Sequence, residues 1–178
     1  LGLLSEEARK TPRRRLNRNL HEMDDPVHRL LNAIEPGSWV RPHRHLDPPR
    51  SETVLVVAGA LGVVLFDDEG AVKETVKLEA GGEVFGVDLD AGTWHGLVAL
   101  VPGTVFFETK PGPYVAPAPQ DRAPWAPAEG ELEAAAASAS AFPARREAFV
   151  VRVSSAPSGA SSAISRSTSL RTSGSPPV

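Results

Sequence analysis

The stretch GSWVRPHRHLDPPRSETVLVVAG, residues 37–59, places metal-binding residue types next to an apolar run that is typical of a β-strand. In an extended strand, residues two apart point to the same face, so His43 and His45 present two imidazoles side by side. Glu52 follows seven residues after His45, beyond a loop that contains two prolines. A neighbouring strand can therefore bring a carboxylate to the two imidazoles.

A third imidazole comes from His95, which follows the turn residue Gly92 much later in the chain. This histidine reaches the others only if the sheet curls around the site. Three neutral imidazoles and one carboxylate suit a divalent transition metal such as Fe, Mn, Ni, Co or Zn. Four such ligands also leave positions for water or substrate. The predicted metal ligands are therefore His43, His45, Glu52 and His95.

The central part of the chain is divided by turn residues into short apolar runs, which indicate consecutive antiparallel strands. These runs are Val54–Ala58, Leu61–Phe66, Ala71–Leu78, Glu83–Leu89, Leu97–Val101 and Val105–Thr109. We expect tight connections that pair neighbouring strands at Gly59-Ala60 and at Pro102-Gly103. Strands at this spacing are typical of an all-β sandwich or barrel. The apolar residues of Val27–Glu35 fit both a helix and a strand.

The two ends of the chain differ in composition from its centre. Residues 1–25 are polar and charged, and we expect an N-terminal arm with a short helix capped by Ser5. Residues 26–130 are expected to form the barrel together with a Pro-rich closing segment. Residues 131–178 are rich in Ala and Ser and cannot bury enough apolar surface to offset their ordering entropy. We expect this tail to be disordered, with local order only around Phe142 and 148–153.

Composition excludes several classes of site. The 178 residues include no Cys, which excludes disulfides, thiolate metal sites and cysteine nucleophiles. The net charge of −3 argues against non-specific nucleic-acid binding. The uncharged apolar stretch 53–66 is shorter than the roughly 20 residues that a membrane-spanning helix needs. Because the first residues also lack the apolar core of a secretory signal, we expect a cytoplasmic protein with no nucleic-acid or membrane partner.

The spacing of these residues resembles the signatures of the cupin superfamily. The first signature is matched by Gly37-x5-His43-x-His45-x6-Glu52-x6-Gly59, and the second by Gly92-x2-His95. The gap before Glu52 is longer than usual, and Asp90 and Ala99 replace a Pro and an Asn. None of these departures removes a ligand.

A closer resemblance is to the WbuC-type cupin-fold metalloproteins, over Arg15 to about Gly130. It is carried by strings such as RLNRNLH (15–21), DPVHRLLNA (25–33), RPHRH (41–45) and AGTWH (91–95). The resemblance implies a small antiparallel β-barrel of the jelly-roll type that holds a divalent metal and is often associated with surface-polysaccharide genes. It favours a strand over Val27–Glu35, and the Ala/Ser tail has no counterpart in that family.

Four residues are candidates for contact with a ligand. Arg41 shares the strand parity of His43 and His45, so its guanidinium is expected to face the metal; alternatively, Pro42 disturbs the strand and Arg41 pairs with a protein carboxylate. The basic arm through Arg15 could fold over the barrel mouth, which would favour an anionic sugar. The remaining candidates are His21, Lys110 and Tyr114.

Three functions remain open at this point. The first is a metal-dependent isomerase, epimerase or lyase acting on a sugar or sugar acid in surface-polysaccharide metabolism. The second is an Fe(II) dioxygenase, and the third is a non-catalytic module that anchors a small sugar or anion on the metal. The sequence shows no catalytic base beyond the ligands, so whether the protein is an enzyme stays open. We also expect a homodimer.

Overall fold

The computed structural model describes residues 1–127, 150–153 and 164–165. Its helical elements are α1 (Gly2–Lys10) and the short 3-10 helix η1 (Pro119–Asp121). Its strands are β1 (Arg15–Asn19), β2 (Val27–Ile34), β3 (Trp39–His43), β4 (Glu52–Ala58), β5 (Ala60–Phe66), β6 (Val72–Glu79), β7 (Gly86–Leu89), β8 (His95–Ala99), β9 (Thr104–Pro111), β10 (Val150–Val153) and β11 (Ile164–Ser165). None of the described helices is both long enough and apolar enough to cross a bilayer.

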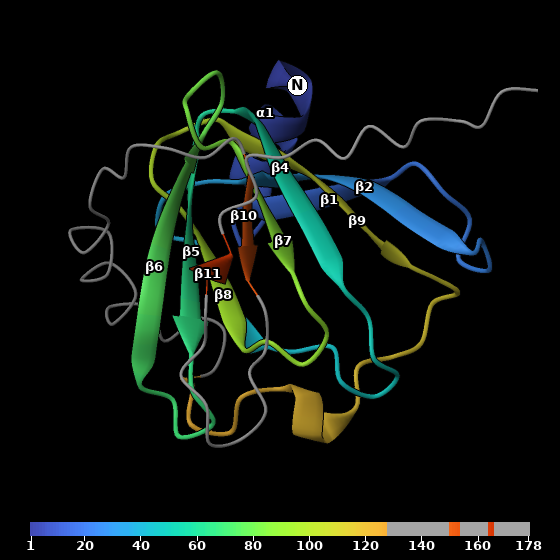
Figure 1. The fold of residues 1–178 in the computed structure, drawn as a ribbon. Coiled ribbons are helices and arrows are strands. Elements are labelled where there is room, and N and C mark those ends of the chain that lie inside the picture. The colour runs from blue at the N-terminus through green and yellow to red at the C-terminus, as the bar shows by residue number, and fades with distance from the viewer. Residues whose placement is uncertain (128–149, 154–163, 166–178) are drawn as a thin grey trace, which may run out of the picture.

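The strand pairing defines a jelly roll. β2 pairs with β9, β3 with β8, β4 with β7 and β5 with β6, all antiparallel. Pairings that nest in this way describe one long hairpin rolled into two facing sheets, as Figure 1 shows. The predicted all-β class and antiparallel jelly-roll architecture are confirmed, and Val27–Ile34 is a strand.

Both of the predicted tight pairings are wrong. β4 and β9 belong to the larger sheet, whereas β5 and β8 belong to the smaller one, so neither turn joins paired strands. The turn at Gly59, with φ +73°, instead carries the chain across from one sheet to the other. Thr104 follows the second of these turns and hydrogen-bonds to the residue after the first. Its hydroxyl accepts from the Ala60 amide at 3.2 Å and lies 3.0 Å from the Ala60 carbonyl. A turn signal alone does not distinguish such a crossing from a hairpin.

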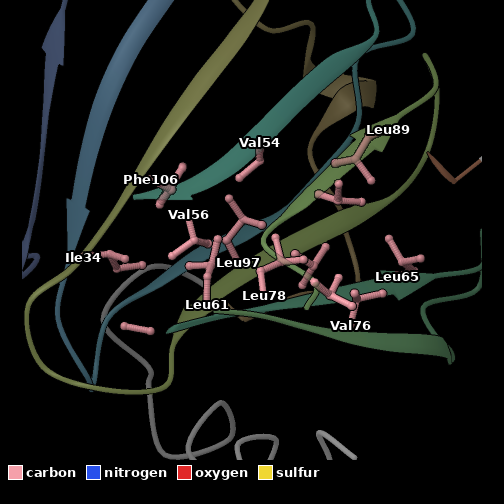
Figure 2. Packing of buried hydrophobic residues seen from close by; sticks show 14 residues of the cluster. Ile34, Val54, Val56, Leu61, Leu65, Val76, Leu78, Leu89, Leu97 and Phe106 are labelled. Carbon is pink, nitrogen blue, oxygen red and sulfur yellow. The ribbon is translucent and has the colours of Figure 1, made fainter. Parts of the chain in front are cut away.

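The space between the sheets is filled by alternate residues of facing strands, as Figure 2 shows. β4 contributes Val54 and Val56, and β5 contributes Leu61, Val63 and Leu65, so that successive core residues of each strand are two apart on one face. Phe106 of β9 is the largest fully buried side chain of this cluster. Branched aliphatic side chains thus supply the core in a chain with few aromatics.

The N-terminal segment packs onto the barrel. α1 begins at Gly2 after Leu1, without a side-chain cap, and Ser5 is buried within the helix rather than capping it. Leu4 and Ala8 pack against β2 and β9 residues. β1 is an edge strand that pairs antiparallel with β2. This strand is not predicted from the sequence, because its residues are mostly polar.

Two short strands lie in the segment expected to be disordered. β10 falls within the run expected to order locally and pairs in parallel with β7. β11, which was not expected, pairs antiparallel with β10. The rest of 131–178, including Phe142, lies outside the described residues, and its disorder stays a prediction.

Replacing Gly59 with Ala should lower the free energy of unfolding by about 3 kcal/mol. A Cβ at this position would lie 2.6 Å from Oγ1 and 2.9 Å from Cα of Thr104, in addition to the strain of a positive φ. Gly37 is the matched control, because its φ is +85° and an added Cβ would meet nothing within 4 Å. Gly37→Ala should cost only about 1–2 kcal/mol. Urea denaturation measures both, and equal losses would contradict the predicted clash.

Candidate metal centre

Four side chains from different parts of the chain converge between the sheets. His43 ends β3, His95 begins β8, Glu52 begins β4, and His45 lies in the loop between β3 and β4. One potential ligand atom from each lies within 4.8 Å of those of the other three. The pairing of β3 with β8 sets His43 directly opposite His95, with ring centroids 4.4 Å apart. The predicted convergence of these four residues is confirmed.

Hydrogen bonds to the backbone orient two of the imidazoles. Nδ1 of His43 donates to the Arg41 carbonyl at 3.0 Å, and Nδ1 of His95 donates to the Thr93 carbonyl at 2.9 Å. A carbonyl only accepts, so Nδ1 carries the proton and Nε2 keeps its lone pair. Burial is the main cause that lowers the pKa of both histidines, which keeps them neutral.

His95 shows directly that the centre fits a metal ion. Its side chain is only 1% exposed, and Nε2 has no hydrogen-bond partner in the described part of the chain. A buried polar atom without a partner costs about 1–3 kcal/mol, which coordination of an ion would offset. The donor set of three imidazoles and one carboxylate is chemically suited to a divalent transition metal.

Glu52 is the charged member of the centre. Its Oε2 accepts from Nε2 of His45 at 2.8 Å and from Nζ of Lys110 at 3.3 Å. Burial alone would raise its pKa, but the charge of Lys110 and the hydrogen bond from His45 hold the pKa of Glu52 well below its usual value. The carboxylate is therefore ionised, as a metal ligand must be.

Glu108 is a site residue that sequence reasoning missed. Lys110 Nζ donates to Glu108 Oε1 at 2.6 Å, and Asn32 Nδ2 donates to Glu108 Oε2 at 2.9 Å. Burial, followed by the negative charge of Glu52, raises the pKa of Glu108. The two carboxylates outweigh burial at Lys110 and raise the pKa of the ammonium group. Strand parity could have found Glu108, because it lies two residues from Lys110 on β9 and shares its face.

The centre lies between two cavities. A cavity of about 430 Å³ is lined by His43, Glu52, Glu108 and Lys110, and by residues of β1, β2 and the segment before them that include Arg13, Arg15, Asn17 and Asn32. A cavity of about 60 Å³ is lined by residues that include His45, Lys110, Tyr114 and Asp121. His43 and Glu52 thus line the larger cavity, His45 lines the smaller one, and Lys110 lines both.

Of the predicted ligand contacts, Lys110 donates to Glu52 and Tyr114 lines the smaller cavity with His45, whereas Arg41 and His21 line neither cavity. The β3–β8 register shifts between Val40 and His43, which breaks strand parity, and Val40 takes the cavity-facing position. Arg41 instead donates from Nη2 to the Ala123 carbonyl at 2.7 Å. The alternative that Pro42 disturbs the strand therefore describes β3 better, although the partner is a carbonyl rather than a carboxylate.

His21 lies away from the four converging side chains. Its ring stacks on His28 with centroids 4.0 Å apart, and Nδ1 lies 3.0 Å from the Arg29 amide that donates to it. His21 does not line either of the two cavities. These contacts are those of a residue that holds the turn between β1 and β2.

Comparisons with known proteins give one family and a group of structures. A family model described as a domain of unknown function (DUF6016) matches residues 1–78. No curated protein matches the sequence. Among solved structures, KdgF from a Halomonas species is 22% identical over 60% of this chain and 84% of its own, with a TM-score of 0.45.

Two further structures have similar scores. An oxalate decarboxylase from Lactobacillus farciminis, solved as a formate complex, is 20% identical over 56% of this chain and 29% of its own, with a TM-score of 0.44. A conserved Streptococcus pyogenes protein of unknown function is 17% identical over 59% and 80%, with a TM-score of 0.45. The assignment of the fold to the jelly rolls rests on the nested strand pairing itself.

Replacing Lys110 with Met should lower the free energy of unfolding by about 3–5 kcal/mol when chelator is present. The change leaves the buried Glu52 and Glu108 carboxylates without the cation they share. The control is Lys77→Met, because Lys77 and Glu79 form a similar pair with side chains 36% and 54% exposed. An exposed pair contributes less than about 1 kcal/mol. Similar losses in both variants, measured by urea denaturation, would show that Lys110 does not neutralise the buried acids.

Proposed function

We propose that this chain is a metal-dependent enzyme of the isomerase, epimerase or lyase type that acts on a small anionic sugar or sugar acid. The observation that carries the proposal is the convergence of His43, His45, Glu52 and His95 within 4.8 Å, where His43 and Glu52 also line the larger cavity. These four residues would hold a divalent ion. The bound ion would supply Lewis-acid polarisation of a carbonyl or hydroxyl oxygen of the substrate.

Glu108 is the residue that would move a proton. It lines the larger cavity with two of the ligands but is not one of the four. Lys110 and Asn32 each hold one of its oxygens, so the carboxyl group has a defined orientation toward the cavity. A carboxyl group of raised pKa can take a proton from a substrate carbon or oxygen and return it elsewhere. A module that only binds a ligand needs no such group, so Glu108 favours an enzyme.

The basic residues of the cavity support an anionic substrate. Arg13 and Arg15 come from the N-terminal segment and line the cavity together with Lys110. Arg15 donates from Nη1 to the Trp39 carbonyl, which anchors its guanidinium beside the barrel. A charge-assisted contact to a carboxylate or phosphate contributes about 1.5–3 kcal/mol.

The resemblance to WbuC-type cupin-fold metalloproteins supports a role in surface-polysaccharide metabolism. Uronic acids and sugar phosphates are anionic and carry the oxygens that a divalent ion polarises. A cavity of about 430 Å³ is large enough for a ligand of that size. We therefore propose these two classes as the first substrates to screen, with formation of product separating an enzyme from a binding module.

Chelator-treated protein should take up one divalent ion per chain when titrated with Mn²⁺, Fe²⁺, Co²⁺, Ni²⁺ or Zn²⁺. Removal of one imidazole from the set should prevent stoichiometric binding, so His45→Ala should retain almost no metal after desalting. His21→Ala is the control, because this histidine stacks on His28 away from the centre. Elemental analysis of the desalted proteins measures the ratio. Wild-type protein without retained metal, or His45→Ala with wild-type content, would refute the assignment.

Replacing Arg15 with Ala should weaken galacturonate binding to the metal-loaded protein by roughly ten- to a hundredfold and change galactose binding little. Arg18→Ala is the matched control from the same strand, because Arg18 pairs with Glu7 in solvent. Arg41→Ala should not discriminate between the two sugars, since its guanidinium donates to a backbone carbonyl. Calorimetric titration of both sugars decides the question. Equal weakening of both by Arg15→Ala would remove the case for an anionic substrate.

A further inference from the structure

We infer that residues 117–126, named the closing strap from here on, form part of the metal centre, and that Asp121 is the positioning residue of His45. This inference rests on the proposed metal site. In Figure 1 the strap, which contains η1, runs beside the loop between β3 and β4. That loop carries His45 and connects two of the other ligands, His43 and Glu52.

His45 differs from the other three ligands in how its backbone is held. His43, Glu52 and His95 occupy strand positions and take part in the strand pairing, whereas His45 lies outside β3 and β4. Its carbonyl accepts from the Gly92 amide at 3.1 Å and from the Arg50 amide at 3.2 Å. The loop residues on either side of His45 depend on other contacts.

The strap supplies those contacts through its backbone. The Arg44 amide donates to the Asp121 carbonyl at 2.9 Å, and the Ala123 amide donates to the Pro42 carbonyl at 3.0 Å. His43 and Arg122 form an antiparallel bridge between these two bonds. The strap therefore continues the strand pairing of β3 at the point where β3 itself ends.

The Asp121 side chain completes the attachment. Its Oδ2 accepts from the amides of Leu46 and Asp47 at 3.1 and 3.0 Å, and its Oδ1 accepts from Nε of Arg44 at 3.4 Å. The residue is only 2% exposed, so these bonds are shielded from water. One carboxylate thus binds the residues immediately before and after His45.

An apolar cluster holds the strap in place independently of Asp121. Ala123 and Ala126 of the strap are buried against Trp94, the residue before His95. Trp94 also lies under the Arg44 guanidinium, 4.5 Å from ring centroid to Cζ, and donates to Asp68 Oδ1 at 3.0 Å. Removing the Asp121 carboxylate should therefore release the His45 loop without displacing the strap.

The expected consequence is weaker metal binding. A loop that is ordered before binding does not lose its backbone entropy when the ion binds, and that entropy amounts to about 1–2 kcal/mol per residue. Groups that orient a ligand from outside the coordination sphere typically change metal affinity by roughly 10- to 100-fold. Asp121 holds three donors around one of four ligands and should act within this range.

The test is titration of Co²⁺ alone into the chelator-treated full chain, followed by calorimetry and visible absorption. Asp121→Ala should bind Co²⁺ about 10- to 100-fold more weakly, with a changed absorption spectrum because His45 no longer coordinates in its wild-type position. Asp121→Asn keeps one oxygen for the two amides but turns an NH₂ group toward Arg44, so about tenfold weakening is expected. Asp68→Ala is the matched control, because Asp68 contacts Arg44 and Trp94 but not the amides after His45.

The outcomes separate the inference from the proposed function. Wild-type affinity and spectrum in Asp121→Ala, with tight binding by the wild type, would overturn the role of Asp121 and leave the metal site intact. If Asp121→Ala does not fold, wild-type affinity in Asp121→Asn has the same meaning. A wild-type protein that binds no Co²⁺ would overturn the metal site itself. Weakening as large in Asp68→Ala would overturn the role of Asp121 by assigning the effect to general loosening of the cluster.

Discussion

The burial of the Glu52 carboxylate is the constraint on which the arrangement of the centre depends. A buried negative charge needs compensation, and Glu52 receives it from His45 and Lys110. Lys110 also donates a hydrogen bond to one oxygen of Glu108, and Asn32 on the neighbouring strand donates to the other. One buried charge therefore organises side chains from β2, β4, β9 and the loop after β3. His45 and Glu52, which share a hydrogen bond here, would both have to present a lone pair to hold an ion.

The jelly roll explains how residues so distant in sequence reach one another. The β3–β8 pairing sets His43 against His95, and β4 enters the same space from the facing sheet with Glu52 at its first residue. Because two ligands begin strands and one ends a strand, the centre lies where the apolar packing between the sheets gives way to polar side chains. The N-terminal segment and the closing strap supply the remaining walls. The strap serves the ligand that no strand holds, which is His45.

Strand parity holds at some positions of the barrel and fails at others for a physical reason. Parity correctly relates Glu108 to Lys110 on β9, where the strand is regular at both residues. It fails for Arg41, because the register shift after Val40 changes which side chains face the cavity. The turn signals at Gly59 and Gly103 located the ends of strands but not their partners. Hairpins and crossings both use glycine with positive φ, and only the packing of the two sheets selects between them.

The sequence by itself determined the all-β class, most of the strand segments and the four converging residues, because alternation and the spacing of His and Glu are local properties of the chain. Tertiary structure alone decided the strand partners, the acidic and basic residues around Glu52 and the attachment of the His45 loop to Asp121. Those contacts join residues 44–47 to 121, 52 to 110 and 32 to 108. Contacts between residues this far apart in sequence depend on the burial and packing of whole sheets, and no local pattern in the chain encodes them.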